Sequence, residues 1–384
     1  MVRHSWLKAL RQLINGTRGY RASRRPRLTQ HWSVVSIEIQ ALESRRLLSG
    51  APAATGTPPV QPIPKEPTDF ILAHPFGAVS SATSTPTGIT PAQMRQAYGM
   101  NTISFGGVAG DGSGQTIAIV DAYNNPNIIS DLSGFDAYFG LSDPPSFNVL
   151  NEFGGTNLPG KDPFGKGGWS VEEALDVEWA HVMAPKANLI LFEAASQNPS
   201  DLFTAVDTAR NTAGVSVVSM SFGYPEYQYY LDYYDSYFLT PNGHQGVTFV
   251  ASTGDSGAGV AYPAASPNVV SVGGTTLTVD SSGNYIGETG WSGSGGGYSF
   301  YESEPAYQRS VQSSGSRTNP DVSMDADPNT GVPVYDTYDF GSTTPWEEVG
   351  GTSLSAPMFG GVMAVVDQGR VLTGHTTLDG ATQT

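Results

Sequence analysis

The chain has 384 residues, 39% of them hydrophobic, which is enough for one large globular domain or two ordinary ones. Residues 1–50 contain ten Lys or Arg and two Asp or Glu, a net charge of +8. The whole chain has a net charge of −16, so residues 51–384 have a net charge of −24. Such an acidic body argues against a nucleic-acid-binding face, which needs clustered Lys and Arg. The sequence has no Cys, which excludes disulfides and Cys-based chemistry. It also lacks an apolar run of about 18 residues, so we expect no membrane span.

The basic segment 1–50 is interpreted as an export or targeting segment. It contains the pair Arg24-Arg25, typical of twin-arginine signals, although no clean apolar stretch follows it. The alternative is a basic tail. Residues 51–85 are rich in Pro, Ala and Thr and are expected to form an extended linker. We therefore expect a secreted or cell-surface protein with one folded domain over residues 86–384.

Short apolar segments alternate with helical patterns through the middle of the chain. The predicted strands are residues 116–120, 188–192, 215–219 and 247–251, and the predicted helices are residues 127–139, 170–183, 200–211 and 226–239. This alternation predicts a doubly wound, mostly parallel α/β sheet with helices on both faces. Sites in such sheets gather at the carboxyl ends of the strands. Three candidates lie there: Asp121, Ser221 with Gly223, and Asp255.

A Gly-Gly-Thr-Ser-Leu-Ser-Ala-Pro run over residues 350–357 precedes an apolar helical segment. Ser353 is thereby placed at a helix start, where backbone amides and the helix dipole favour negative charge. Such a position suits a nucleophile whose product is an oxyanion. A Thr-Ser pair before a helix is usually only a cap. The full run, however, is the pattern around the nucleophile of subtilisin-like peptidases.

A subtilisin-type enzyme needs a histidine as general base. None of the six histidines lies in the His-Gly-Thr context of such enzymes: His4, His31, His74, His181, His244 and His375. Instead, Glu172 and Asp176 are four residues apart, on one face of a predicted helix. Repulsion and burial would hold a proton on one of them, and such a pair can accept the proton of a serine hydroxyl in acid. The alternative is a solvated acidic helix face.

The loop after the strand at 247–251 contains Gly254-Asp255-Ser256-Gly257. This run resembles the nucleophile loop of chymotrypsin-like enzymes, which would make Ser256 catalytic. Those enzymes are all-β and need a histidine partner, so we favour Asp255 instead. A protonated aspartate can donate a hydrogen bond to a developing oxyanion. The alternative is a simple turn residue.

Taken together and in this order, the three motifs resemble those of the sedolisin family of serine-carboxyl peptidases, over about residues 85–370. The resemblance implies a subtilisin-like fold in which Ser353 attacks the peptide carbonyl, Glu172 takes its proton, Asp176 supports Glu172 and Asp255 helps to hold the oxyanion. It also implies that three residues bind the substrate chain: Ser221, Gly223 and Gly254. A carboxylate base suits acid, where histidine stays charged. The sequence thus predicts a secreted, acid-acting, monomeric serine endopeptidase that hydrolyses polypeptides.

The sequence departs from the family pattern in two respects. Asp121 and Phe222 stand where some members extend the proton network with Glu and Trp, so a weaker outer network is expected. Calcium is usual in the family, and its ligands come from a segment after the nucleophile helix. The chain ends at Thr384, so we expect that segment to be missing and assign no metal ligand and no cofactor.

Two other functions remain open from the sequence. A truncated, inactive copy could act as a surface or binding module. A histidine-dependent, subtilisin-like peptidase would require His181 to lie within hydrogen-bonding distance of Ser353, whereas we predict that Glu172 approaches Ser353.

Overall fold

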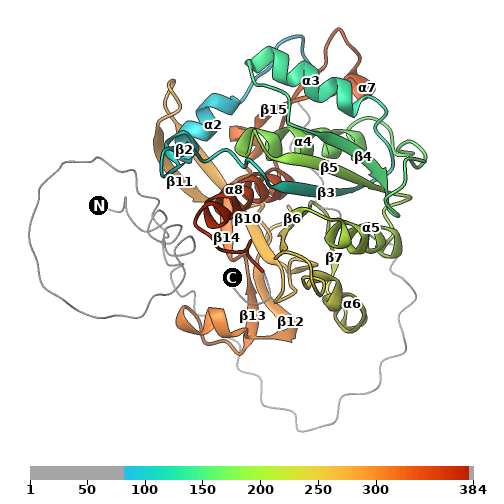
Figure 1. Cartoon of the computed structure of the whole chain (residues 1–384), viewed down its shortest axis with the longest axis vertical. Helices are drawn as coiled ribbons and strands as arrows, with labels where there is room; N and C mark the ends of the chain where they lie inside the picture. Colours follow the sequence, from blue (N-terminus) through green and yellow to red (C-terminus); the bar gives the residue numbers. More distant parts are fainter. Residues whose placement is uncertain (1–81, 380–384) are drawn as a thin grey trace, which may run out of the picture.

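The computed structural model describes residues 82–379 (Figure 1). The predicted targeting segment 1–50 lies outside these residues, as does the predicted linker 51–85 up to residue 81. Within the described part, the Thr83 N–H donates to the Trp346 carbonyl at 2.8 Å. The folded part of the chain therefore includes Thr83, slightly before the expected domain start at residue 86.

One eight-stranded sheet forms the centre of the fold. Its strands run β11-β10-β8-β6-β3-β5-β4, with β14 also paired to β10; all neighbours are parallel except β10 with β11. The strands are β3 Thr116–Ala122, β4 Phe147–Asn151, β5 Asn188–Ala194, β6 Val215–Met220, β8 Thr248–Ser252, β10 Val270–Val279, β11 Tyr285–Gly290 and β14 Val322–Asp325. The predicted doubly wound, mostly parallel sheet is confirmed.

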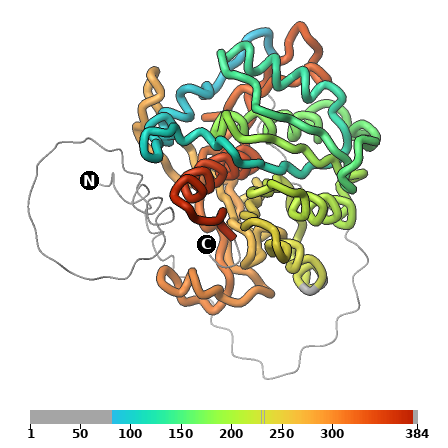
Figure 2. Tube along the Cα trace, viewed as in Figure 1, coloured from blue at the N-terminus to red at the C-terminus, as the bar shows by residue number. Residues whose placement is uncertain are grey.

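Helices cover both faces of this sheet, as Figures 1 and 2 show, with α8 running through the middle of the molecule. The α-helices are α2 Pro91–Ala97, α3 Ile128–Phe139, α4 Trp169–Met183, α5 Pro199–Asn211, α6 Gln228–Tyr234, α7 Thr337–Phe340 and α8 Thr352–Leu372. Successive residues of a strand face opposite sides of the sheet, so each central strand contributes side chains to the hydrophobic cores on both faces. In β3, Ile117 and Ile119 join the core under α4 and α8, whereas Ala118 and Val120 join the core under α5.

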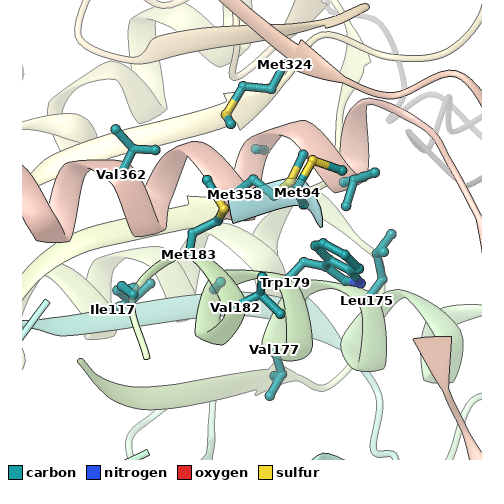
Figure 3. Close-up of a cluster of buried hydrophobic side chains, with 14 of the residues drawn as sticks. Met94, Ile117, Leu175, Val177, Trp179, Val182, Met183, Met324, Met358 and Val362 are labelled. Carbon is teal, nitrogen blue, oxygen red and sulfur yellow. The ribbon is translucent and has the colours of Figure 1, made fainter. Parts of the chain in front are cut away.

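The core between α4 and α8 holds these two helices against each other. Met183 of α4 and Met358 of α8 lie between the helices, with Leu175 and Val362 in the same cluster (Figure 3). At Gly361 of α8 a side chain would place its Cβ only 2.6 Å from the Cβ of Met183. The close approach of the two helices brings the first turn of α8 near the first half of α4.

Two-stranded ribbons surround the sheet, and the sequence did not predict them. They pair β1 Ser104–Phe105 with β2 Val108–Ala109, β7 Tyr224–Pro225 with β9 Ala261–Tyr262, β12 Gly297–Ser303 with β13 Ser316–Asn319, and β15 Val332–Tyr335 with β16 Trp346–Val349. The helix predicted at 226–239 is shorter than expected. It comprises α6 and a 3-10 helix, Asp235–Phe238, after the strand β7.

Candidate active site

Ser353 lies in the first turn of α8. The chain enters this helix through Gly351, whose φ of 123° is a conformation that favours glycine. The next residue, Thr352, donates its backbone N–H and its hydroxyl to Oδ1 of Asp255, each at 2.7 Å. Ser353 itself is fully buried. Asp255 therefore anchors the start of α8 and lies beside the predicted nucleophile.

Helix α4 carries Glu172 and Asp176, and all of its residues are buried. A side-chain hydrogen bond with Ser353 lowers the pKa of Glu172, although neither carboxylate oxygen has a partner of ordinary hydrogen-bond geometry. The contact is thus loose, as catalytic hydrogen bonds often are before substrate binds. The predicted approach of Glu172 to Ser353 agrees with the structure.

Asp176 is held by a contact that the sequence did not predict. The Ser221 hydroxyl lies 2.9 Å from Oδ1 of Asp176 and 3.3 Å from the carbonyl oxygen of Ser353. Ser221 directly follows β6, so the end of a central strand links α4 to α8. The Ser221 side chain is buried and serves to position Asp176, a role distinct from the predicted backbone contact with substrate.

Burial dominates the protonation of this pair. Desolvation raises the pKa of Glu172 well above its ordinary value, and the negative charges of Asp176 and Asp121 raise it further. Desolvation and the negative charge of Asp121 also raise the pKa of Asp176, whereas the hydrogen bond from Ser221 lowers it. Two such carboxyls lose their protons in two coupled steps. The singly ionised pair can accept one proton and is the form suited to act as a base.

Asp255 has the properties of a neutral hydrogen-bond donor in acid. Burial raises its pKa to about 6, although both hydrogen bonds from Thr352 lower it. Oδ1 accepts those two bonds, whereas the buried Oδ2 has no partner. A proton on Oδ2 below pH 6 could therefore be donated to a negatively charged oxygen formed beside Ser353.

Three more buried carboxyls adjoin the pair. Asp121 and Glu193 are neighbours in the register of β3 and β5, and Glu173 follows Glu172 on α4. Burial raises the pKa of Asp121 to about 8 and that of Glu193 to about 8. Neither oxygen of Asp121 has a hydrogen-bond partner, which agrees with the weaker outer network expected from the sequence. Its charge nevertheless influences both Glu172 and Asp176.

The structure excludes His181 as the partner of Ser353. His181 lies nine residues after Glu172 on α4, which is about 13 Å along the helix axis. Its Nε2 contacts Oδ2 of Asp136 at 3.2 Å and the carbonyl oxygen of Ser142 at 3.1 Å. The structure therefore contradicts the histidine-dependent alternative in the form that uses His181.

The other two residues predicted to bind substrate have different surroundings. Gly223 is buried just before β7. The N–H of Gly254 donates to the Thr352 hydroxyl at 3.0 Å, and its carbonyl accepts from the N–H of Gly295 at 2.6 Å. The N–H of Gly254 is thus used within the protein, and its carbonyl oxygen accepts one of the two hydrogen bonds that it can accept. Its role in the structure is to join the Asp255 loop to α8.

Within residues 82–379 no group of three or more His, Asp or Glu side chains is arranged to hold a metal ion. No step of the chemistry is assigned to a metal ion. In the same part of the chain, no helix is both long and apolar enough to cross a bilayer.

Comparison with known proteins identifies the family. Residues 166–377 match the subtilase family, known as Peptidase_S8. The chain belongs to the subtilase family. This subtilase is 34% identical to kumamolisin of Bacillus sp. (strain MN-32) over 316 residues, and 29% identical to sedolisin of Pseudomonas sp. (strain 101) over 329 residues. These alignments cover 75% and 76% of this chain and 54% of each relative, so the chain spans about half the length of the curated relatives it matches.

More distant relatives and solved structures agree. Human tripeptidyl-peptidase 1 is 25% identical over 355 residues, which cover 81% of this subtilase and 57% of the relative. The structure of Pseudomonas sedolisin, a serine-carboxyl proteinase complexed with pseudo-iodotyrostatin, aligns with a TM-score of 0.64 and 28% identity over 78% of this chain and 85% of that one. A lanthipeptide protease shares the fold at a TM-score of 0.51 and 15% identity, covering 76% and 83%. The expected sedolisin-family membership and subtilisin-like fold are confirmed.

Proposed function

We propose that this protein is a secreted, acid-acting serine-carboxyl endopeptidase that hydrolyses polypeptides through an acyl-enzyme on Ser353. The observation that carries the proposal is the meeting of Ser353 with Glu172 at the crossing of α8 and α4. Ser221 links Asp176 to the Ser353 backbone, which keeps the second carboxyl at the same place. The similarity to sedolisin and kumamolisin supports the same reaction.

The geometry gives each of the four side chains a separate role in the reaction. Glu172, in the singly ionised pair, accepts the Ser353 proton as the hydroxyl oxygen bonds to the substrate carbonyl carbon. The negative charge then moves to the carbonyl oxygen, and the protonated Asp255 donates a hydrogen bond to it. Glu172 returns its proton to the leaving amine, and water later hydrolyses the acyl-enzyme by the same route. Asp176 keeps Glu172 in place and shares its proton.

Secretion is supported by the basic segment 1–50, interpreted as an export segment. A carboxyl base and an oxyanion donor that needs a proton both suit an acidic medium, which is the reason for proposing action in acid.

The proposal is tested by digesting denatured casein with the purified full chain between pH 3 and pH 8. We expect cleavage in acid that is abolished in Ser353→Ala and in Glu172→Ala, with His181→Ala as the matched control on the same helix. Cleavage that survives both catalytic changes would refute the assignment. A folded but inactive wild-type protein would favour the non-catalytic binding module instead.

A further inference from the structure

Strand β12 pairs with β13 near the bottom of the described part of the molecule in Figure 1, and it carries three exposed aromatic side chains. Phe300 is 90% exposed, Tyr298 is 59% exposed and Tyr301 is 45% exposed. Exposed apolar groups this close together are characteristic of binding surfaces, because rings left in water gain free energy when a partner covers them. We call these three residues the aromatic projection.

The backbone that carries the aromatic projection is held in place by polar contacts. β12 pairs with β13 at Tyr298 and again at Ser303, and the register shifts between them. In this irregular stretch the Glu226 carboxylate accepts a hydrogen bond from the Ser299 hydroxyl and another, of 2.9 Å, from the Phe300 N–H. The Ser299 oxygen in turn accepts the N–H groups of Tyr301 and Glu302, at 3.1 and 2.7 Å. The N–H groups of Phe300, Tyr301 and Glu302 therefore have hydrogen-bond partners within the protein. A binding partner would contact the rings and not the edge of the strand.

The same segment is joined to the catalytic loop. Gly295 donates its N–H to the carbonyl of Gly254 at 2.6 Å, and Gly296 and Gly259 exchange N–H and carbonyl bonds of 2.8 and 3.0 Å. A side chain at Gly295 would place its Cβ 2.0 Å from the Thr253 carbonyl oxygen. The loop that carries Asp255 and the start of β12 therefore form one packed unit.

Glu226 ties the aromatic projection to a second segment that the sequence predicted to bind the substrate chain. It follows the segment from Ser221 to Gly223, and its carboxylate bonds Ser299 and Phe300. Phe300 comes five residues after Gly295, at most about 17 Å along an extended chain. An extended substrate advances about 3.3 Å per residue, so a substrate chain that lies beside Gly295 would reach Phe300 within about five residues.

We propose that Tyr298, Phe300 and Tyr301 form a substrate subsite that binds one large apolar or aromatic side chain of the polypeptide, several residues from the bond that is cut. This inference rests on the proposed peptidase function and adds to it a preference for apolar residues at one distant position. Because the backbone that carries the rings is already held in place, little backbone conformational entropy is lost on binding. The subsite acts on substrate affinity, not on the chemical step.

The cleavage test uses a series of quenched fluorescent peptides in which a single Phe is moved through an otherwise polar sequence. The wild-type protein is expected to prefer Phe at one position distant from the scissile bond. Phe300→Ser and Tyr301→Ser are expected to raise KM for that peptide about tenfold with kcat unchanged, whereas Phe300→Leu retains the preference. Ile286→Ser, which changes a 64% exposed residue on β11, is the matched control and should have no effect.

A binding measurement separates this inference from the proposed function. The same peptides are titrated into Ser353→Ala, with and without Phe300→Ser, and the dissociation constant is measured by fluorescence anisotropy. Binding that weakens about tenfold with Phe300→Ser supports the subsite whether or not the wild-type protein cuts. Equal binding in the two variants would overturn it. So would a wild-type dimer in sedimentation that Phe300→Ser dissociates, since a second copy would then cover the projection.

Discussion

At the scale of single residues, the candidate site depends on which buried oxygen atoms have partners. The motifs indicated Ser353, Glu172, Asp176 and Asp255, and the structure brings these four residues together. The side-chain role of Ser221 could not be predicted, because a serine after a strand gives no sign of which helix its hydroxyl will meet. Likewise, the sequence shows that Asp121 ends a strand, but its burial depends on the whole fold.

The pKa of Asp255 leads to a prediction about pH. Above its pKa of about 6 the Asp255 carboxyl loses the proton that it would donate and places a negative charge beside the oxyanion. We expect kcat/KM to fall about tenfold per pH unit above that value. Asp255→Asn keeps an N–H donor at every pH and should lose this alkaline decline, which a pH profile with a peptide substrate will show.

Asp255→Ala is the control for this prediction. It removes the donor at every pH and should reduce kcat about 100- to 1000-fold. If Asp255→Asn retained the alkaline decline of the wild-type protein, another group would be responsible for it.

At the scale of elements, the packing of α8 on α4 positions the site. The sequence predicted a helix at 170–183, close to the observed α4, and a helix after the Gly-Gly-Thr-Ser run, where α8 begins. The region 226–239 was predicted less well, because its many tyrosines pack between α5 and the β7–β9 ribbon and do not form one continuous amphipathic face. The two-stranded ribbons were missed since most of their strands have only two or four residues, too few to give a periodic signal.

Adjacent glycines in α8 provide a test of this packing. A Cβ at Gly361 would lie 2.6 Å from the Cβ of Met183 and 3.0 Å from the carbonyl oxygen of Ala180 on α4. Gly361→Ala should therefore push the helices apart, lower the free energy of unfolding by about 1–3 kcal/mol and reduce activity. Thermal unfolding and casein cleavage measure the two effects.

Gly360→Ala is the matched control in the same helix. Its Cβ would meet its nearest neighbours, in Val217 and Val250, at 3.6 Å, an ordinary contact. The better helix propensity of alanine should then stabilise the protein by up to about 1 kcal/mol. Equal effects of the two substitutions would contradict the close packing of α4 and α8.

At the scale of the whole molecule, the described residues contain many buried carboxyls whose pKa is raised. Besides the catalytic region, burial raises the pKa of Asp336 and of Glu347 to about 7, and that of Asp367 to about 8. The sequence predicted the acidic body and the order of helices and strands. Which carboxyls are buried could not be predicted, because an amphipathic pattern does not distinguish a solvated acidic residue from one covered by a neighbouring element.

These groups make stability depend on pH in a defined direction. A carboxyl whose pKa is raised by folding binds its proton more tightly in the folded state, so it stabilises the protein below about pH 4 and this stabilisation is lost as pH rises through the raised pKa. Each fully buried group contributes about 1.4 kcal/mol per pH unit in that window. We therefore expect the melting temperature to be highest near pH 4 and to fall toward pH 8.

Asp367→Asn tests the direction of this effect away from the candidate site. The amide keeps an oxygen for the Leu378 N–H, which donates to Asp367 at 2.7 Å, but it cannot ionise. Calorimetry should show a flatter decline of melting temperature between pH 4 and pH 8 than in the wild-type protein. A melting temperature that rises over this range would contradict the account.

The central claim is that Ser353 is the nucleophile and that Glu172, not a histidine, accepts its proton. It is tested most directly by mixing the full chain with a peptide ester at pH 4, quenching in acid and mapping the acylated residue by mass spectrometry. The account predicts acylation of Ser353 that is absent in Ser353→Ala, strongly slowed in Glu172→Gln and unchanged in His181→Ala. Acylation of another residue, or acylation that requires His181 and not Glu172, would contradict it.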